Sequence, residues 1–109
     1  MLIEENPEQS LKIINQILEN DKEEIDAINQ KGCILVIFDE YEKAIQCFNR
    51  CLEIENTYYY SLFNKALILR MMNKLEDSLT CFDELLTVTD DSKIKTYPLE
   101  ILDKLHERK

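Results

Sequence analysis

A repeat of 34 residues runs through the middle of this 109-residue chain. Residues 25–56 can be laid on residues 59–90 without a gap. The residues of the first copy that recur unchanged in the second are Lys31, Ile34, Leu35, Glu42, Cys47, Phe48 and Leu52. Nearly all matched positions are apolar or small positions of two helix-period patterns. A chain with such self-similarity folds as a stack of one repeated unit, which constrains its fold more than any other feature.

Each copy predicts a pair of helices joined by a short break. Apolar residues recur at helical spacing on both sides of Asp39-Glu40 in the first copy and of Asn73-Lys74 in the second. Neither break contains a glycine, so the sequence leaves the conformation of the turn open. Two antiparallel helix pairs are the expected result.

Small residues lie in the middle of the first predicted helix of each copy, at Gly32 and Ala66. A glycine inside a helix costs about 1 kcal/mol relative to alanine, so Gly32 needs a structural reason. We expect the two helices of a pair to approach closely at this position. Phe48 and Phe82 would then fill the space beside it.

Composition agrees with an all-α fold. One glycine and two prolines are too few for the many tight turns of a β-sandwich or a β-barrel. Apolar residues make up 45% of the chain, which is enough for a folded core, and the length is that of one ordinary domain. We therefore expect a single all-α domain over residues 1–109.

The repeat resembles the tetratricopeptide repeat, a helix–turn–helix unit of 34 residues. Besides the small residue at Gly32 and Ala66, Tyr41 opens a second helix as the family signature requires. Ala44 and Phe48 follow at a spacing of four, and Ser78 and Phe82 take these places in the second copy. Both copies depart from the signature at three places: Ile28 and Leu62 replace its Trp, Leu35 and Leu69 its Tyr, and Asn56 and Asp90 its closing Pro. The second copy also has Leu75 where an aromatic residue would open the second helix.

The resemblance implies a right-handed superhelix of antiparallel helix pairs, a TPR-like α-solenoid, with repeats at 25–58 and 59–92. The same register makes residues 6–20 a half repeat, begun by Asn6 as N-cap and Pro7 in the first turn. Residues 93–109 would form a C-terminal capping helix, kinked or shifted to about 97–108. Its leucines Leu99, Leu102 and Leu105 are expected to face the second repeat.

Family resemblance also implies a function in protein–protein interaction, as a scaffold or adaptor, and no enzymatic activity. In the family, the first helix of each pair lines a concave groove that holds a partner peptide or helix. The residues that this register places in the groove are Asn29, Cys33, Val36, Ile37, Tyr60, Phe63, Asn64, Leu67, Arg70 and Met71. Only Asn64 matches the family pattern that clamps the carboxylate of chaperone tails, so that ligand is not expected.

An apolar strip remains in this groove, made of Tyr60, Phe63, Leu67 and Met71. A stripe at helical spacing indicates either core packing or a binding surface. If it is a surface, it needs a cover, which the terminal helix, a second copy of the chain or a partner could provide. Our hypothesis is that all four residues of the strip anchor the partner and that Phe63 and Leu67 are accessible in the monomer.

Self-association is the alternative function. The first predicted helix lacks the partner helix of a complete repeat, which would leave Leu11, Ile14 and Leu18 poorly covered on one side. A homodimer could bury either this patch or the groove.

Charge and reactive residues narrow the partners. The net charge of −9 opposes binding to nucleic acid and suggests an apolar, neutral-to-basic protein or peptide partner. Without a membrane span or a signal peptide at the acidic N-terminus, we expect an intracellular, cytoplasmic protein with reduced thiols. The four cysteines and the single histidine, His106, do not form a ligand set, so no metal, cofactor or catalytic residue is predicted.

Overall fold

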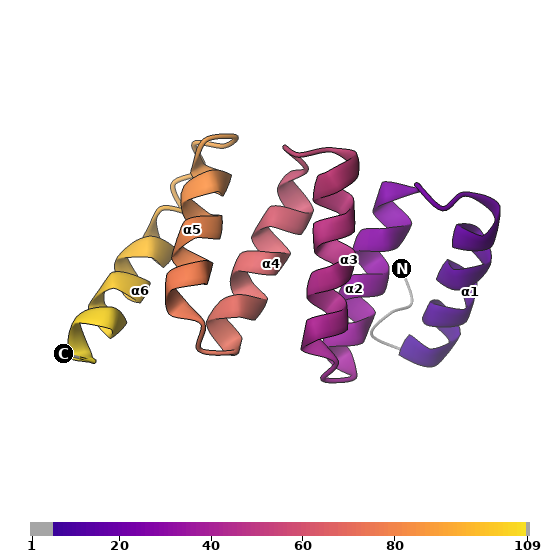
Figure 1. The fold of residues 1–109 in the computed structure, drawn as a ribbon, viewed down its shortest axis with the longest axis horizontal. Helices are drawn as coiled ribbons and strands as arrows, with labels where there is room; N and C mark the ends of the chain where they lie inside the picture. Colours follow the sequence, from indigo (N-terminus) through magenta and orange to yellow (C-terminus); the bar gives the residue numbers. More distant parts are fainter. Residues whose placement is uncertain (1–5, 109) are drawn as a thin grey trace. The chain divides into compact units, whose positions relative to one another are not determined.

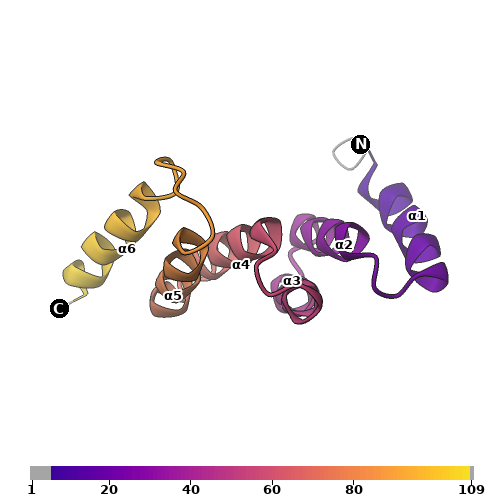
Figure 2. The same ribbon diagram turned by 90° about the horizontal axis from the view of Figure 1, so that it is seen from above.

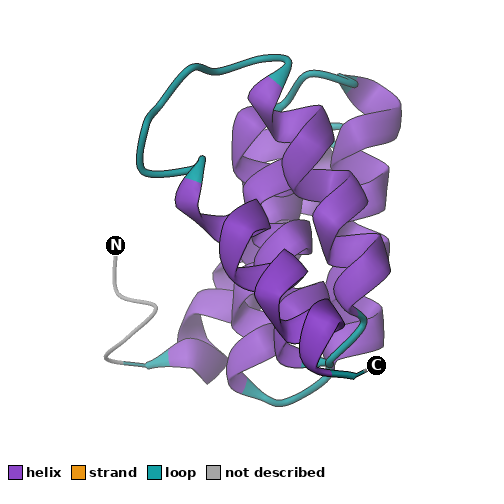
Figure 3. Cartoon of the chain, turned by 90° about the vertical axis from the view of Figure 1, so that its left-hand side faces the viewer, coloured by secondary structure: helices purple, strands orange, loops and turns teal. Residues whose placement is uncertain are grey.

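The computed structural model describes residues 6–108, and regular structure in this range is entirely α-helical (Figure 1). Figure 3 shows that helices and connecting loops account for all of the described chain. The helices are α1 (Pro7–Asn20), α2 (Ile25–Ile37), α3 (Tyr41–Ile54), α4 (Tyr59–Met71), α5 (Leu75–Leu86) and α6 (Thr96–Glu107). The prediction of an all-α fold made of consecutive helix pairs is confirmed.

Two compact units divide the chain between Asn56 and Thr57. Unit 1 contains α1, α2 and α3, and unit 2 contains α4, α5 and α6. In unit 1 the pair α2–α3 packs side by side, and α1 packs against α2 (Figure 2). In unit 2, α4 pairs with α5, and α6 packs on α5. The N-terminal residues 1–5, which bear on the signal-peptide expectation, lie outside the described residues.

A close approach of α2 and α3 explains the single glycine. A Cβ atom built on Gly32 would lie 2.5 Å from Cε1 of Phe48, closer than packed carbon atoms ever come. The Phe48 ring is fully buried, with 0% of its surface exposed. The predicted role of Gly32 is therefore confirmed. In unit 2 the equivalent Ala66 is fully buried, and its carbonyl accepts a hydrogen bond of 2.7 Å from Ser78 Oγ.

In both helix pairs, the residue at the equivalent position of the turn has a left-handed backbone conformation. Asp39 has a φ of 60° and Asn73 a φ of 62°, although neither is glycine. Aspartate and asparagine tolerate this conformation better than most residues. In unit 2 the Asn73 N–H donates to the Arg70 carbonyl at 3.0 Å, and the Lys74 N–H donates to that of Leu69 at 2.8 Å. This pair of bonds is a Schellman motif, which satisfies the last carbonyls of α4.

Replacing Asn73 should change stability with a sign that depends on the new residue. Asn73→Gly should raise the free energy of unfolding by about 0.5 kcal/mol, because glycine avoids the left-handed penalty but gains freedom in the unfolded chain. Asn73→Val should lower it by about 1–2 kcal/mol, because a β-branched side chain is strained at this φ. Urea unfolding of both variants measures the two values. A stabilising valine would show that the turn is not left-handed in solution.

Helix α1 is better covered than the sequence suggested. Its N-terminus begins as predicted, with Asn6 Oδ1 accepting a hydrogen bond of 3.0 Å from the Gln9 N–H. Ile14, expected to be poorly covered, is only 1% exposed because it packs with Ala27 and Ile34 of α2. Leu11 and Leu18 pack against the same cluster and are half-buried. The expected open patch on these three residues is therefore wrong.

Helix α6 packs on α5 with a different face than the one predicted. Leu99 is 64% exposed, which corrects the expectation that it faces the second repeat, whereas Leu102 is 46% exposed and lines a pocket against α5. Pro98 and Ile101 are buried instead. Pro98 lies in the first turn of the helix, where its missing N–H has no helical partner to lose, so proline is compatible with the helix start. Leu105 is half-buried.

Among residues 6–108, no helix is both long enough and apolar enough to cross a membrane.

Candidate functional site

The predicted groove residues of unit 2 follow one face of α4 and differ widely in exposure. Tyr60 and Met71, near the two ends of the helix, are 60% and 58% exposed. Phe63, Asn64, Leu67 and Arg70, which lie between them, are half-buried. The face of α4 therefore presents two open apolar side chains and a partly covered centre.

Helix α6 provides the cover. Tyr97 stacks on Phe82 of α5, with 4.9 Å between ring centroids and 2° between ring planes. The same ring meets Phe63 of α4 edge-on at 5.8 Å, and the Arg70 guanidinium lies 4.9 Å from its centroid. Arg70 also forms an ion pair of 3.6 Å with Glu100 of α6. Of the three covers that the sequence left open, the terminal helix is the one that contacts Phe63 and Arg70.

These contacts correct the expectation that Phe63 lies open. Its ring packs against Tyr59, Phe82 and Tyr97, with centroid distances of 6.2, 6.4 and 5.8 Å. Phe82 belongs to the fully buried core. A charge at position 63 would therefore be placed against the buried ring of Phe82 and the half-buried rings of Tyr59 and Tyr97.

The sequence analysis did not identify Tyr97 as a site residue. Its signal was present, because Tyr97 lies 34 residues after Phe63 and so occupies the equivalent place in the next repeat. The proline at position 98 obscured it, since proline argued against a regular helix there.

In unit 1 the predicted groove residues lie on α2. Ile37 is 48% exposed, and Asn29, Cys33 and Val36 are half-buried. Ile37 is the last residue of α2 and directly precedes the C-cap Phe38. Unit 1 thus offers less open apolar surface at these positions than α4 does.

The four cysteines are buried or half-buried in the structure. Cys51 and Cys81 are buried, and Cys33 and Cys47 are half-buried. Burial raises the pKa of the Cys33, Cys47 and Cys81 thiols above the ordinary value, so they stay protonated at neutral pH. The Cys51 thiol donates to the Ile25 carbonyl at 3.5 Å. Within the described chain, no three His, Cys, Asp or Glu side chains are placed to hold a metal ion.

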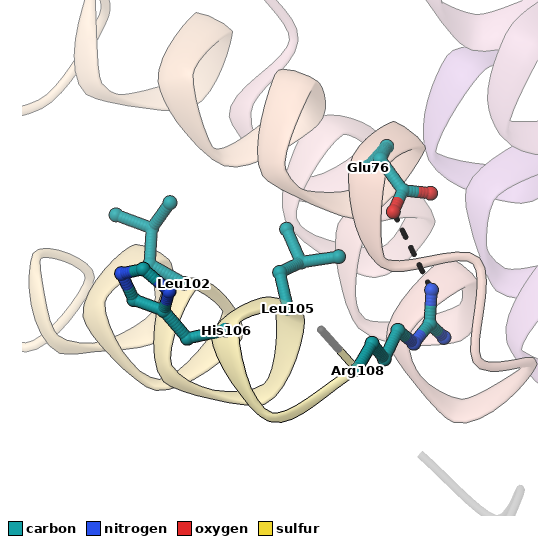
Figure 4. A pocket seen from close by; sticks show the side chains of 5 residues that line it. All are labelled: Glu76, Leu102, Leu105, His106 and Arg108. Atoms are coloured by element: carbon teal, nitrogen blue, oxygen red, sulfur yellow. Dashed lines mark hydrogen bonds and ion pairs between the residues drawn. The ribbon is translucent and has the colours of Figure 1, made fainter.

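A pocket of about 590 Å³ lies between α5 and α6 (Figure 4). Leu105 points from α6 toward α5, and Leu102 and His106 lie on the α6 side. Arg108 closes one end through an ion pair of 3.4 Å with Glu76. Both partners of this pair are exposed, so it contributes at most about 1 kcal/mol. The pocket offers apolar contact rather than a set of reacting groups.

Comparison with known proteins bears on the fold and on one repeat. Residues 25–58 match the family model of the tetratricopeptide repeat. A solved structure of a MamA variant, "MamA RS-1 ArsTM double mutant", matches with a TM-score of 0.85 at 16% identity, over 94% of this chain and 58% of that one. A second MamA crystal structure matches with a TM-score of 0.69 at 12% identity, over 90% of this chain and 68% of that one. No curated protein matches the sequence.

Proposed function

On the premise that this chain is a tetratricopeptide-repeat protein, we propose that it is an interaction module that binds an apolar peptide or helix along α4. Proteins built from this repeat generally act as non-catalytic scaffolds for other proteins. The proposal rests on one observation, the exposure of Tyr60 and Met71 at two predicted groove positions of the same helix. Together with Leu67 between them, the two open side chains make a continuous apolar face on α4, and a continuous exposed apolar face is typical of a binding surface.

Partner contact would begin at the open ends of α4. Tyr60 combines a large apolar ring with a polar hydroxyl, and Met71 is flexible enough to adapt to different partners. Leu67 lies between them on the same face and is half-buried. A helix or an extended apolar segment could contact all three at helical spacing. The central ring of Phe63 would then support the surface from below, through its contact with Tyr97.

Selection of peptides from a displayed random library tests the proposal. We expect the selected peptides to be apolar and to lose affinity for Tyr60→Glu and Met71→Glu, because each variant places a charge in the surface. Leu99→Glu is the matched control, since Leu99 is an equally exposed apolar residue on α6. Circular dichroism verifies that all three variants keep the helical fold. Peptides that bind all variants equally would contradict the assignment to α4.

Self-association stays a second candidate because α1 has an exposed apolar pair of its own. Ile13 and Ile17 are 43% and 42% exposed and lie four residues apart on one face of the helix. A dimer formed through α1 would bury Ile13 and Ile17 rather than Ile14, which is already buried. Light scattering over a concentration series distinguishes the two candidates. A dimer that Ile13→Glu with Ile17→Glu converts to a monomer would favour assembly through α1.

A further inference from the structure

Unit 1 contains a pocket that is separate from the predicted groove residues. It has a volume of about 470 Å³ and lies where the end of α1 meets the pair α2–α3. Its apolar wall consists of Leu18 of α1, Ile28 and Leu35 of α2, and Cys47 of α3. Ile28 and Leu35 are buried, and Leu18 is half-buried, so the pocket has a firm apolar floor.

Four cationic side chains surround this floor. They are Lys22, Lys31, Lys43 and Arg50. The whole chain has only 13 basic residues against 22 acidic ones, so four around one pocket is a local concentration against the overall charge. Lys31 lines the pocket together with Cys47 of its floor.

Glu40, which also lines the pocket, and two carboxylates near it neutralise part of this charge. Lys43 pairs with Glu40 at 3.3 Å, and Arg50 pairs with Glu23 at 3.4 Å and with Glu53 at 3.5 Å. All of these side chains are well exposed, and such pairs are worth only about 0–1 kcal/mol, so an incoming carboxylate can replace them. Lys22 and Lys31 form no salt bridge within residues 6–108. An anionic ligand can therefore pair with these two lysines without displacing another carboxylate.

The second repeat has a smaller pocket at the equivalent place, with two acidic residues at its rim. A pocket of about 250 Å³ between α4 and α5 is lined by Lys65, Leu69 and Cys81. These are the repeat equivalents of Lys31, Leu35 and Cys47.

The charge of the rim is reversed at two of its positions. Asp77 and Glu84 stand in unit 2 where Lys43 and Arg50 stand in unit 1. The two pockets share the equivalents of Leu35 and Cys47 in their floors and carry opposite charges at these two rim positions. The pocket of unit 2 is thus an internal reference for that of unit 1.

We propose that the pocket of unit 1 is a docking site for an acidic segment of a partner protein, in which an apolar side chain is flanked by carboxylates. The apolar side chain would occupy the floor at Leu18, Ile28 and Leu35. The flanking carboxylates would meet the lysines, and Arg50 could bind one of them through two parallel hydrogen bonds. The net charge of −9 does not prevent this, because salt at physiological strength screens charges beyond about 8 Å and leaves the contacting cations dominant.

A fluorescent hexapeptide with two central leucines and two glutamates on each side is the probe. We expect it to bind the full chain, with an affinity that falls as salt rises. The variant Lys43→Asp with Arg50→Glu gives unit 1 the rim of unit 2 and should weaken binding at least about tenfold, since it replaces two attractive contacts with two repulsive ones. Both residues are exposed, and the new ones occur at the same place in α5, so the helix should persist.

Three controls isolate the pocket. The variant Lys93→Asp with Lys104→Glu makes the same change of net charge in unit 2 and should leave the affinity within about twofold, because screened distant charges matter little. Met71→Glu should do the same, which separates this site from the α4 surface. A probe with serines in place of the leucines should bind weakly, because it cannot fill the apolar floor.

Four outcomes would overturn the proposal. One is the absence of probe binding to the wild-type chain at millimolar concentration. Equal weakening by the two charge variants would show that only net charge matters. Equal binding of the serine probe would remove the role of the floor. A wild-type dimer that becomes monomeric in the Lys43→Asp, Arg50→Glu variant would show that a second copy of the chain occupies the pocket.

Discussion

Phe48→Ala should lower the free energy of unfolding by about 3–5 kcal/mol, the largest effect of any single truncation considered for this chain. The ring is fully buried between α2 and α3, where it fills the space that Gly32 leaves. Because the two helices already meet at a glycine, they have little room to collapse into the cavity. Urea unfolding followed by circular dichroism measures the loss. A cost below about 1 kcal/mol would show that the pair repacks freely.

The opposite change at Gly32 tests the same contact. Gly32→Ala should lower stability by about 1–2 kcal/mol, because overpacking costs more than the gain in helix propensity returns. The double variant Gly32→Ala with Phe48→Leu should lose less stability than the sum of the two single variants, because the smaller leucine leaves room for the new methyl group. Additive costs would show that the two positions do not meet in solution. Ala66 in unit 2 already occupies the equivalent place.

Tyr97→Ala should lower the free energy of unfolding by about 2–4 kcal/mol and loosen α6. The variant loses the stack on Phe82 and the edge contact with Phe63, each worth about 0.5–1.5 kcal/mol beyond the buried area, and the cation–π contact with Arg70, worth about 0.5–1 kcal/mol. Urea unfolding gives the stability, and limited proteolysis after residue 91 reports the release of α6. Phe63 would then become more exposed on α4.

Two control variants leave the ring contacts of Tyr97 in place. Tyr97→Phe retains all three ring contacts and should change stability by less than about 0.5 kcal/mol. Leu99→Ala removes an exposed side chain of the same helix and should be equally mild, because Leu99 is 64% exposed. If Leu99→Ala costs as much as Tyr97→Ala, the ring cluster does not hold α6 in place.

The predictions drawn from the repeat succeeded where two copies of a pattern could be compared. The helix pairs, the breaks at Asp39 and Asn73 and the close approach at Gly32 all follow from residues that recur at the same register. The resemblance to tetratricopeptide repeats rests on the same positions, and residues 25–58 match that family. The sequence left open the left-handed turn at Asp39 and Asn73, since it offered no glycine there.

The predictions failed at the ends of the chain, where no second copy was available. Ile14 looked uncovered because its repeat partner is missing, yet α2 covers it. Leu99 and Leu102 looked buried because leucines at helical spacing suggest a core face, yet Pro98 and Ile101 take that role. Periodicity identifies an apolar stripe on a helix, but it does not say which neighbouring helix lies opposite.

The candidate site shows the same difference between what the pattern within one helix predicts and what the packing of helices decides. Its residues on α4 were named from the register, and their role in binding stays a prediction. That Tyr97 and Glu100 reach back to Phe63 and Arg70 depends on how α6 packs, which no pattern within α4 records.

By itself, the sequence determined the helices, their pairing and the reversal of charge between Lys43, Arg50 and their repeat equivalents Asp77 and Glu84. The helices and their pairing follow from a periodicity that both copies share, and the charge reversal follows from comparing residue identities between the copies. Only the tertiary structure decided which apolar residues are covered and that the reversed charges border a pocket. Burial and pocket shape depend on contacts between helices distant in the chain, and those contacts are set by packing rather than by spacing.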